Sequence, residues 1–285
     1  MARLPHTVLL LALTSLASSR LVADFLNNNG CPQFFLKTAQ GHVTPPVLRN
    51  PHHLICQRYM GQDRFATLYD TRNKIPTYSA YLYVPHVHLV RANQWWTEPD
   101  LTEHNQAQYS DYQGSGKERG HLYPAYQNNN NVQMDATFTL TNAAPQDDKF
   151  NKAWFHNVER KLAQQITKLY LDVFLYTVYG HIYYLNGMTF FPLESPDETI
   201  ISFCLIAVNV PSYFWTAYCC LDNNYRLVAS GGYIASWNGQ IQLQSKSILD
   251  LEKDLASHYH IGAFPVFGGL CYGVGLSGGV NYTQY

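Results

Sequence analysis

Alternation of apolar and polar positions predicts β-strands in the first third of the chain. Residues Phe65 to Asp70 and Thr77 to Val84 are rich in β-branched and aromatic side chains, and the turn-forming residues Thr71 to Lys74 lie between them. We therefore expect two strands joined by a turn. Residues 24–62 contain Asn-Asn-Asn-Gly and Pro-Pro sequences, which predict loops rather than long elements.

The period of the pattern changes in the middle of the chain. Residues Ala136 to Asn142 alternate and predict a further strand, whereas residues Arg91 to Gly116 are mostly polar and are expected to cover the surface. From Asp147 to about Tyr170 apolar residues recur at helical spacing, and acidic residues at the start suit the positive end of a helix. The apolar stripe of this helix comprises Trp154, Val158, Leu162 and Leu169.

The last third of the chain is rich in strand-forming residues, with a short helix expected from Ser247 to Ser257. Two strands joined by a turn explain the apolar stretch Phe203 to Leu221 better than a membrane span, because Asn209 and Pro211 interrupt it. Strands, one long helix and further strands predict an α+β fold with a central antiparallel or mixed sheet. No linker divides residues 20–285, so we interpret them as one domain.

Residues 1–19 have the layout of a secretory signal peptide. Arg3 precedes an apolar run from Val8 to Leu13, and Ala17 and Ser19 are small residues at the spacing of a cleavage site. The run is too short to span a bilayer. We expect cleavage after Ser19 and a secreted protein; the alternative is a buried N-terminal helix.

Six cysteines fit an oxidising compartment, where an even number favours disulfides. The sequence does not choose among their pairings, although the adjacent Cys219 and Cys220 are expected to reach different partners. No CxxC pair is present, which argues against a zinc site. The triplet that begins at Asn281 matches a glycosylation acceptor. The other cysteines are Cys31, Cys56, Cys204 and Cys271.

Composition excludes a disordered chain and does not point to a polyanion partner. The 285 residues are 46% hydrophobic and 14% aromatic, which is enough for a full core. The formal charge is −1, and it falls to −2 without residues 1–19 because Arg3 is their only charged residue. Nucleic-acid-binding domains are usually basic, so any such partner needs a local cationic site.

The residues that carry chemistry lie between Lys117 and Arg160. Arg119 and His121 precede the predicted strand, and Asn151 lies on the helix that follows it. A neutral histidine is a competent general base near neutral pH, and an amide oxygen suits a hard cation such as Mg²⁺. The forked guanidinium of Arg119 suits a phosphate. Such a ββα unit can hold a base and a metal ligand on facing elements.

Helix geometry separates the expected roles of Asn151 and Glu159. Eight residues correspond to about 12 Å along a helix axis and about 80° of rotation, so both side chains cannot contact one ion directly. Helical side chains lean toward the N-terminus, so Glu159 reaches back toward Asn151. We expect Asn151 to be the direct ligand and Glu159 to act through metal-bound water.

This block resembles the DNA/RNA non-specific endonuclease family and, within it, the vertebrate endonuclease domain-containing 1 proteins. The family signature is Asp-Arg-Gly-His followed by a helix that bears an asparagine. The similarity is strongest from Phe65 to Arg160 and includes the Thr-Asn-x-x-Pro-Gln sequence at Thr141. One departure is Glu118, which stands where the signature has Asp. The carboxylate is kept on a longer side chain, so its contacts must shift.

The resemblance implies a ββα-metal (His-Me finger) nuclease fold and a residue-by-residue site. His121 matches the general base that activates water, and Arg119 matches the arginine that stabilises charge on the phosphate. Asn151 matches the Mg²⁺ ligand, and Glu159 matches the acid that orients metal-bound water. Glu118 matches the first carboxylate of the signature.

Three further residues complete the expected site. Asn142 matches a family asparagine that orients the backbone or His121, and Arg64 matches a second arginine that contacts phosphate. Lys117 adds positive charge beside the motif. The resemblance also implies DNA and RNA as substrates, products with 5′-phosphates, and Mg²⁺ as the cofactor with Mn²⁺ as a substitute.

Structural interpretations stand beside these functional ones. Asn142 could simply be a turn residue, and Glu159 could lie on a solvated helix face. The pairs His86/His88 and His258/His260 lack a recognisable third ligand, so we interpret them as structural. A phosphate-binding loop ending at Lys117 is rejected because its first glycine and its Ser/Thr are missing.

The sequence thus predicts a secreted, Mg²⁺-dependent nuclease of low specificity. The alternative is a weak or inactive nucleic-acid-binding or immune-associated protein on the same scaffold, for which the replacement at Glu118 and the low total charge are the reasons. A disulfide-rich adhesive protein is a third, weaker hypothesis. The oligomeric state is not predicted.

Overall fold

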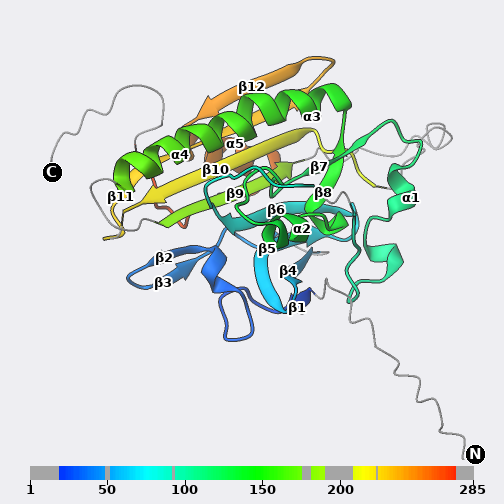
Figure 1. Cartoon of the computed structure of the whole chain (residues 1–285), viewed down its shortest axis with the longest axis horizontal. Coiled ribbons are helices and arrows are strands. Elements are labelled where there is room, and N and C mark those ends of the chain that lie inside the picture. Colours follow the sequence, from blue (N-terminus) through cyan, green and yellow to red (C-terminus); the bar gives the residue numbers. More distant parts are fainter. Residues whose placement is uncertain are drawn as a thin grey trace, which may run out of the picture.

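One antiparallel sheet organises the chain. The computed structural model describes residues 19–48, 52–91, 94–174, 181–189, 208–222 and 224–273. Eight strands form the sheet in the order β1-β4-β5-β6-β9-β10-β11-β12, and every neighbouring pair is antiparallel (Figure 1). Their bounds are β1 Arg20–Val22, β4 His52–Tyr59, β5 Gln62–Asp70, β6 Ile75–Leu82, β9 His181–Thr189, β10 Tyr213–Leu221, β11 Leu227–Trp237 and β12 Ile241–Lys246.

The two faces of the sheet carry different layers. Alternate side chains of β10 point to opposite faces: Trp215 and Cys219 pack in one core cluster with helix α5 (Ile248–His258), and Tyr218 packs in another with helix α4 (Arg160–Phe174). Figure 1 shows α4 lying across the front of the sheet. We call the α4 side the site face and the α5 side the far face.

The long connection between β6 and β9 forms the site face. It contains a separate two-stranded ladder, β7 (Glu118–His121) with β8 (Ala143–Gln146), followed by α3 (Asp148–Trp154). The unit is therefore strand, strand and helix, as the sequence predicted. The remaining short elements are η1 Pro32–Phe34, β2 Leu36–Thr38, β3 Gly41–Val43, η2 Glu103–Asn105, α1 Tyr109–Tyr112, α2 Asn131–Ala136 and η3 Leu140–Asn142.

The predicted long helix forms, but it changes its winding in the middle. A π-helical turn, Phe155–Glu159, joins α3 to α4. The predicted stripe residues Trp154, Val158 and Leu162 are buried; the side chain of Leu169 lies outside the described part. A π turn holds more residues than an α turn, and such turns are frequent at functional sites.

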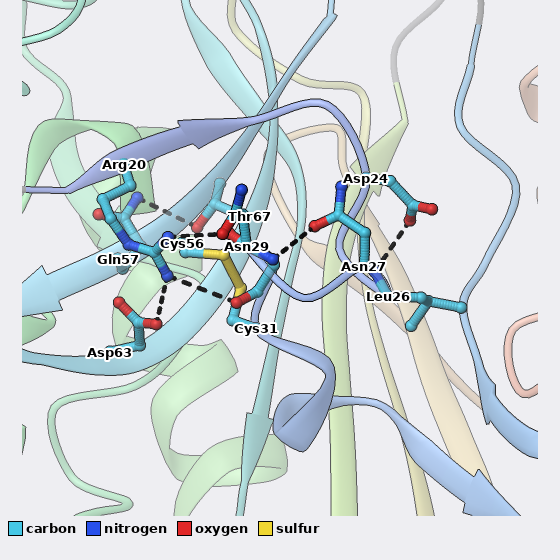
Figure 2. Close-up of a disulfide and its surroundings, with 11 residues drawn as sticks. Arg20, Asp24, Leu26, Asn27, Asn29, Cys31, Cys56, Gln57, Asp63 and Thr67 are labelled. Carbon is cyan, nitrogen blue, oxygen red and sulfur yellow. Dashed lines mark hydrogen bonds and ion pairs between the residues drawn. A yellow bond between two sulfur atoms is a disulfide. The ribbon is translucent and has the colours of Figure 1, made fainter.

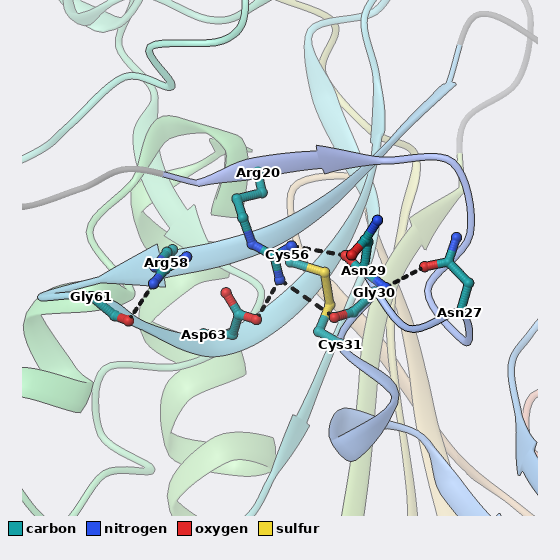
Figure 3. Close-up of polar contacts among 9 residues, drawn as sticks. All are labelled: Arg20, Asn27, Asn29, Gly30, Cys31, Cys56, Arg58, Gly61 and Asp63. Carbon is teal, nitrogen blue, oxygen red and sulfur yellow. Dashed lines mark hydrogen bonds and ion pairs between the residues drawn. A yellow bond between two sulfur atoms is a disulfide. The ribbon is translucent and has the colours of Figure 1, made fainter.

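The first disulfide attaches the N-terminal loop to the sheet. Cys31 is bonded to Cys56 of β4 (Figure 2). Arg20 holds the neighbouring strand β1 in place: it pairs with Asp63 at 2.7 Å and donates to the carbonyl oxygen of Asn29 at 2.8 Å (Figure 3).

The second disulfide joins Cys219 of β10 to Cys271 near the end of the described chain. Contrary to the expectation of two different disulfide partners, Cys220 carries a free buried thiol. Adjacent strand residues face opposite sides of the sheet, so Cys220 lies under α4 while Cys219 faces α5. Burial raises the pKa of the Cys220 thiol to about 12.

Three sequence predictions for the fold were wrong. Residues Ala136 to Asn142 are not a strand: Ala136 ends α2, and the strand starts only at Ala143. The alternating pattern led to the wrong prediction because every side chain from Ala136 to Asn142 is buried, whereas alternation implies a strand with one buried and one exposed face. The eight-residue strand β4 lies inside the segment predicted as loops. The polar stretch after Arg91 does not merely cover the surface, because Glu98 and Gln106 are buried within it.

Strands β5 and β6 and the helix α5 agree with the sequence prediction, and β9, β10 and β11 lie in the last third, which was expected to be rich in strands. Residues 1–18, Cys204 and Asn281 lie outside the described residues, as does the first part of the apolar stretch from Phe203. In the part of the chain that the structure describes, no helix has both the length and the apolar character needed to cross a membrane.

Candidate active site

A cavity of about 500 Å³ opens between β7 and the long helix. We call it the site cavity. Five of the predicted residues line it: Glu118, Arg119, His121, Asn151 and Glu159. The ββα unit therefore brings together side chains that are up to 41 positions apart in the chain.

Strand geometry explains why Arg119 and His121 reach the same cavity. Residues two apart on a strand point to the same face. Gly120 between them pairs with Ala144 of β8. A Cβ at Gly120 would lie 2.1 Å from the side chain of Gln146, so a larger residue here would have to displace that buried side chain.

The π turn explains why Asn151 and Glu159 share the cavity. An unbroken α-helix would leave about 80° between them. The wider turn at Phe155–Glu159 rotates less per residue, so it brings Glu159 closer to the line of Asn151. Asn151 itself lies early in α3, which starts directly after β8 because Asp147 caps it by accepting from the amide of Lys149.

His121 is surrounded by aromatic rings and cations. Its ring lies 4.7 Å from that of Trp95 and 4.8 Å from that of Phe138, measured between centroids. Burial lowers the pKa of His121 well below its ordinary value, and the charges of Arg91 and Arg119 lower it further. The imidazole is therefore neutral at neutral pH, and its buried Nε2 has no hydrogen-bond partner among the described residues.

The guanidinium of Arg119 lies between two aromatic rings. Its Cζ is 5.2 Å from the ring centroid of Trp95 and 4.9 Å from that of Tyr109. Such cation–π contacts orient an arginine without neutralising its charge. The cation thus stays available to an anion in the site cavity.

A ladder of buried polar side chains attaches this unit to the sheet. Gln57 of β4 donates to Thr141 at 2.8 Å and to Thr67 of β5 at 3.3 Å. Thr67 lies 3.2 Å from Ser79 of β6, which donates to the side-chain oxygen of Asn142 at 2.8 Å. The ladder thus attaches the residues just before β8 to three strands of the sheet, β4, β5 and β6.

Asn142 completes the ladder at the backbone that follows His121. Its side-chain oxygen accepts from the amide of Tyr123 at 2.9 Å, and its NH₂ donates to the carbonyl oxygens of Tyr123 at 3.1 Å and Thr137 at 2.9 Å. Asn142 is fully buried and does not line the cavity. Its contacts are those of a residue that orients the backbone.

Three of the predicted residues do not line the site cavity: Asn142, Arg64 and Lys117. The Nε of Arg64 donates to the carbonyl oxygen of Tyr59 at 3.2 Å, and neither Arg64 nor Lys117 lines the cavity. A different arginine, Arg91, lines the cavity, and its Cζ lies 5.0 Å from the ring centroid of Phe138.

The sequence prediction also missed Trp95, Tyr126 and Lys152, which line the cavity. Trp95 reaches it because its neighbour Trp96 exchanges backbone hydrogen bonds of 2.8 Å with Phe138 and Leu140. The adjacent pair Trp95-Trp96 within a polar stretch is the sequence feature that could have predicted this part of the cavity.

Oxygen donors in the site cavity fit a hydrated hard cation. Burial raises the pKa of Glu159 to about 8, and Arg91 opposes this shift. Among the described residues no three His, Cys, Asp or Glu side chains are grouped closely enough to hold a metal. The donors present are the amide of Asn151, the carboxylate of Glu118 and the side chain of Glu159, which a bound cation would favour in its carboxylate form. This set fits Mg²⁺, which keeps several waters and takes few protein ligands.

Comparison with known proteins identifies the family of this chain. The family model "DNA/RNA non-specific endonuclease" matches residues 53–259. The chain belongs to the DNA/RNA non-specific endonuclease family. The human endonuclease domain-containing 1 protein is 31% identical over 236 residues, which cover 74% of this chain and 43% of that protein.

Two other members of the family match shorter regions. Bovine mitochondrial endonuclease G is 32% identical over 117 residues, which cover 39% of this chain and 36% of that protein. Nuclease C1 of Cunninghamella echinulata var. echinulata is 29% identical over 123 residues, covering 41% and 45%. The chain therefore spans less than half the length of these relatives.

The fold agrees with the family. A chain in the crystal structure of the EndoG/EndoGI complex superposes with a TM-score of 0.51 at 16% identity, covering 70% of this chain and 82% of that one. This match and the ββα unit confirm the predicted α+β, ββα-metal nuclease fold.

Proposed function

We propose that this chain is a secreted, Mg²⁺-dependent endonuclease that hydrolyses phosphodiester bonds of DNA and RNA with little sequence preference. One observation carries the proposal: a single cavity holds a neutral histidine, two arginines and the oxygen donors Asn151 and Glu159. A base, a phosphate clamp and a place for a cation are the parts that phosphodiester hydrolysis requires.

His121 acts as the general base in this proposal. Its unpartnered Nε2 accepts a proton from a water in the cavity, and that water attacks the phosphorus. The neighbouring cations keep the imidazole neutral before the step. The aromatic rings of Trp95 and Phe138 hold the imidazole in one orientation.

The two arginines bind the phosphate. Arg119, held between its aromatic neighbours, and Arg91 donate to the non-bridging oxygens, on which negative charge develops during attack. Apart from the oxygen donors, the lining is mainly cationic and aromatic, which suits contacts to phosphates and base faces rather than to base edges. This arrangement supports low sequence preference.

Asn151 would hold the Mg²⁺, and Glu159 would orient water beside it. When bound, the ion supplies neutralisation of charge at the phosphate and at the leaving oxygen. Cleavage that leaves the phosphate on the 5′ end of the product is what the family resemblance implies.

Disulfides support the secreted location, because such bonds persist in oxidising compartments. Signal-peptide cleavage after Ser19 belongs to the same proposal.

Digestion of plasmid DNA and of RNA by the purified chain tests the proposal. Both substrates should be degraded in Mg²⁺, protected by EDTA, and degraded again after Mg²⁺ or Mn²⁺ is restored, with 5′-phosphates on the products. Binding without cleavage in either ion would instead favour a nucleic-acid-binding protein. The exposed Glu118, which stands where the family signature has Asp, is the observation that favours this second function.

Arg91→Met should change both the rate and its pH dependence. Loss of a charged hydrogen bond to the phosphate should lower kcat/KM by about 10–100-fold. Arg91 also lowers the pKa of His121. Removal of Arg91 should therefore raise the pKa of His121. The imidazole is then protonated, and unable to act as a base, at a higher pH, so the acidic limb of the pH profile should move to higher pH. A pH profile of kcat/KM measures both effects, with the exposed Arg226→Met as the control. An unshifted acid limb would contradict the coupling to His121.

A further inference from the structure

A second hollow adjoins the site cavity on the far side of Tyr126. This side groove has a volume of about 340 Å³ and is lined by His86, Tyr126, Ala163, Gln164, Thr167 and Lys168. Tyr126 lines both hollows, so they share one wall. The mechanism proposed above uses none of the other groove residues.

Three segments build the side groove, and hydrogen bonds hold them together. The amide of Val87 donates to the carbonyl oxygen of Asn128 at 3.3 Å, which joins the segment after β6 to the loop that carries Tyr126. Tyr83 reaches α4, where it donates to the carbonyl oxygen of Ala163 at 3.0 Å and lies 2.6 Å from the hydroxyl of Thr167. The groove is therefore a fixed feature of packed elements.

The loop that carries Tyr126 is also hydrogen-bonded to the long helix at Glu159, a residue of the site cavity. Gln127 donates to the backbone carbonyl oxygen of Glu159 at 3.2 Å. The groove residue Ala163 follows Glu159 by one helical turn, so the groove begins about 6 Å along the axis from the site cavity. The two hollows are therefore close enough to hold adjoining parts of one ligand.

One wall of the side groove is aromatic and uncharged. The rings of His86 and Tyr126 are stacked, with centroids 3.8 Å apart and an angle of 22° between their planes. Burial lowers the pKa of His86 and outweighs an opposing hydrogen bond to the backbone of Tyr126; the nearby His88 lowers the pKa further, so the ring is neutral at neutral pH. This wall offers ring surface rather than charge.

One lysine of α4 also lines the groove. Lys168 is exposed at the groove, and Arg160 and Lys161 are exposed earlier on the same helix. Arg160 and Lys168 are eight residues apart, which places them on one broad side of α4. None of the described residues that line the groove is acidic. A lysine and an aromatic pair in one groove complement a nucleotide, whose phosphate is anionic and whose base stacks.

We propose that the side groove binds the nucleotide next to the scissile phosphate of a single-stranded substrate. The proposal rests on the proposed nuclease function and adds a substrate class to it. Lys168 contacts the phosphate of that nucleotide, and its base stacks on the His86–Tyr126 pair. A base held in a duplex is stacked and paired already, so only an unpaired base can enter.

Binding of a fluorescein-labelled hexathymidylate tests the groove. It is measured by fluorescence anisotropy in Mg²⁺ with the His121→Ala chain, in which cleavage is slow, and repeated with a labelled hairpin duplex long enough to stay paired. Lys168→Met should weaken single-strand binding about tenfold, and Lys168→Arg should restore it. Loss of one phosphate contact should also reduce the slope of log K against log salt by about 0.7.

A second variant separates stacking from charge. His86→Ala should weaken single-strand binding without changing the salt slope, because the ring is neutral. The matched control is Lys37→Met, an exposed lysine on the hairpin of the far face, which should change neither quantity.

The proposal is overturned by any of three results. These are no measurable binding of the single strand, no effect of Lys168→Met on it, and an equal effect of that variant on the duplex. Plasmid digestion by the unmodified chain is assayed separately. If the Lys168 and His86 variants change binding as expected but plasmid is not digested, the nuclease function alone is refuted. If plasmid is digested but these binding changes are not seen, the groove proposal alone is refuted.

Discussion

Replacing His121 by alanine should lower kcat/KM for plasmid and RNA cleavage by about 10²–10⁴-fold, the usual contribution of a general base. The imidazole is the neutral, unpartnered proton acceptor of the site cavity in the proposed mechanism. Arg119 and Asn151 stay in place in the variant, so binding of substrate should change far less than turnover. Initial rates over a range of substrate concentrations separate the two.

The control for this variant is His104→Ala, because His104 is an exposed histidine outside the site cavity. It should retain full activity. Thermal unfolding of both variants checks that the fold survives loss of a ring packed against Trp95 and Phe138. A folded His121→Ala chain that cleaves plasmid at the original rate would exclude His121 as the base.

Replacing Asn142 by leucine should destabilise the fold by about 3–4 kcal/mol, because four partners lose their hydrogen bonds in a buried place. The melting temperature should fall by roughly 6–15 °C for a domain of this size. Asn142→Asp should not rescue stability. Its carboxylate can accept from Ser79 and from the Tyr123 amide but would face two carbonyl oxygens.

Asn131→Leu is the matched control for Asn142, because Asn131 is exposed at the start of α2. Surface changes of this kind usually alter stability by less than about 0.5 kcal/mol. Differential scanning calorimetry measures both variants. Equal melting temperatures for the two would show that the polar ladder does not hold the ββα unit on the sheet.

Local patterns were enough to predict the long helix and most strands. Trp154, Val158 and Leu162 repeat at helical spacing because only one side of that helix meets the sheet. Strand β4 was missed because its polar Gln57 is buried in a ladder that forms only when Thr67 and Thr141 are brought together. Hydrogen bonds between distant segments leave no periodic signal.

The site was predictable where its residues share one motif. Arg119, His121, Asn151 and Glu159 lie within one ββα unit, and the structure places them around one cavity. Arg91 comes from a separate segment that is held to the unit by backbone bonds of Trp96, so spacing alone could not select it over Arg64. The π turn likewise was not visible in the apolar stripe.

The separation of the two faces of the sheet has a consequence for how this protein can change. Both disulfides and α5 lie in the core cluster of the far face, whereas the site cavity lies on the other. Effects of substitutions at distant sites with no shared partners usually add. Stabilising substitutions beneath α5 could therefore offset destabilising ones near His121, so evolution or engineering could alter catalysis and robustness independently.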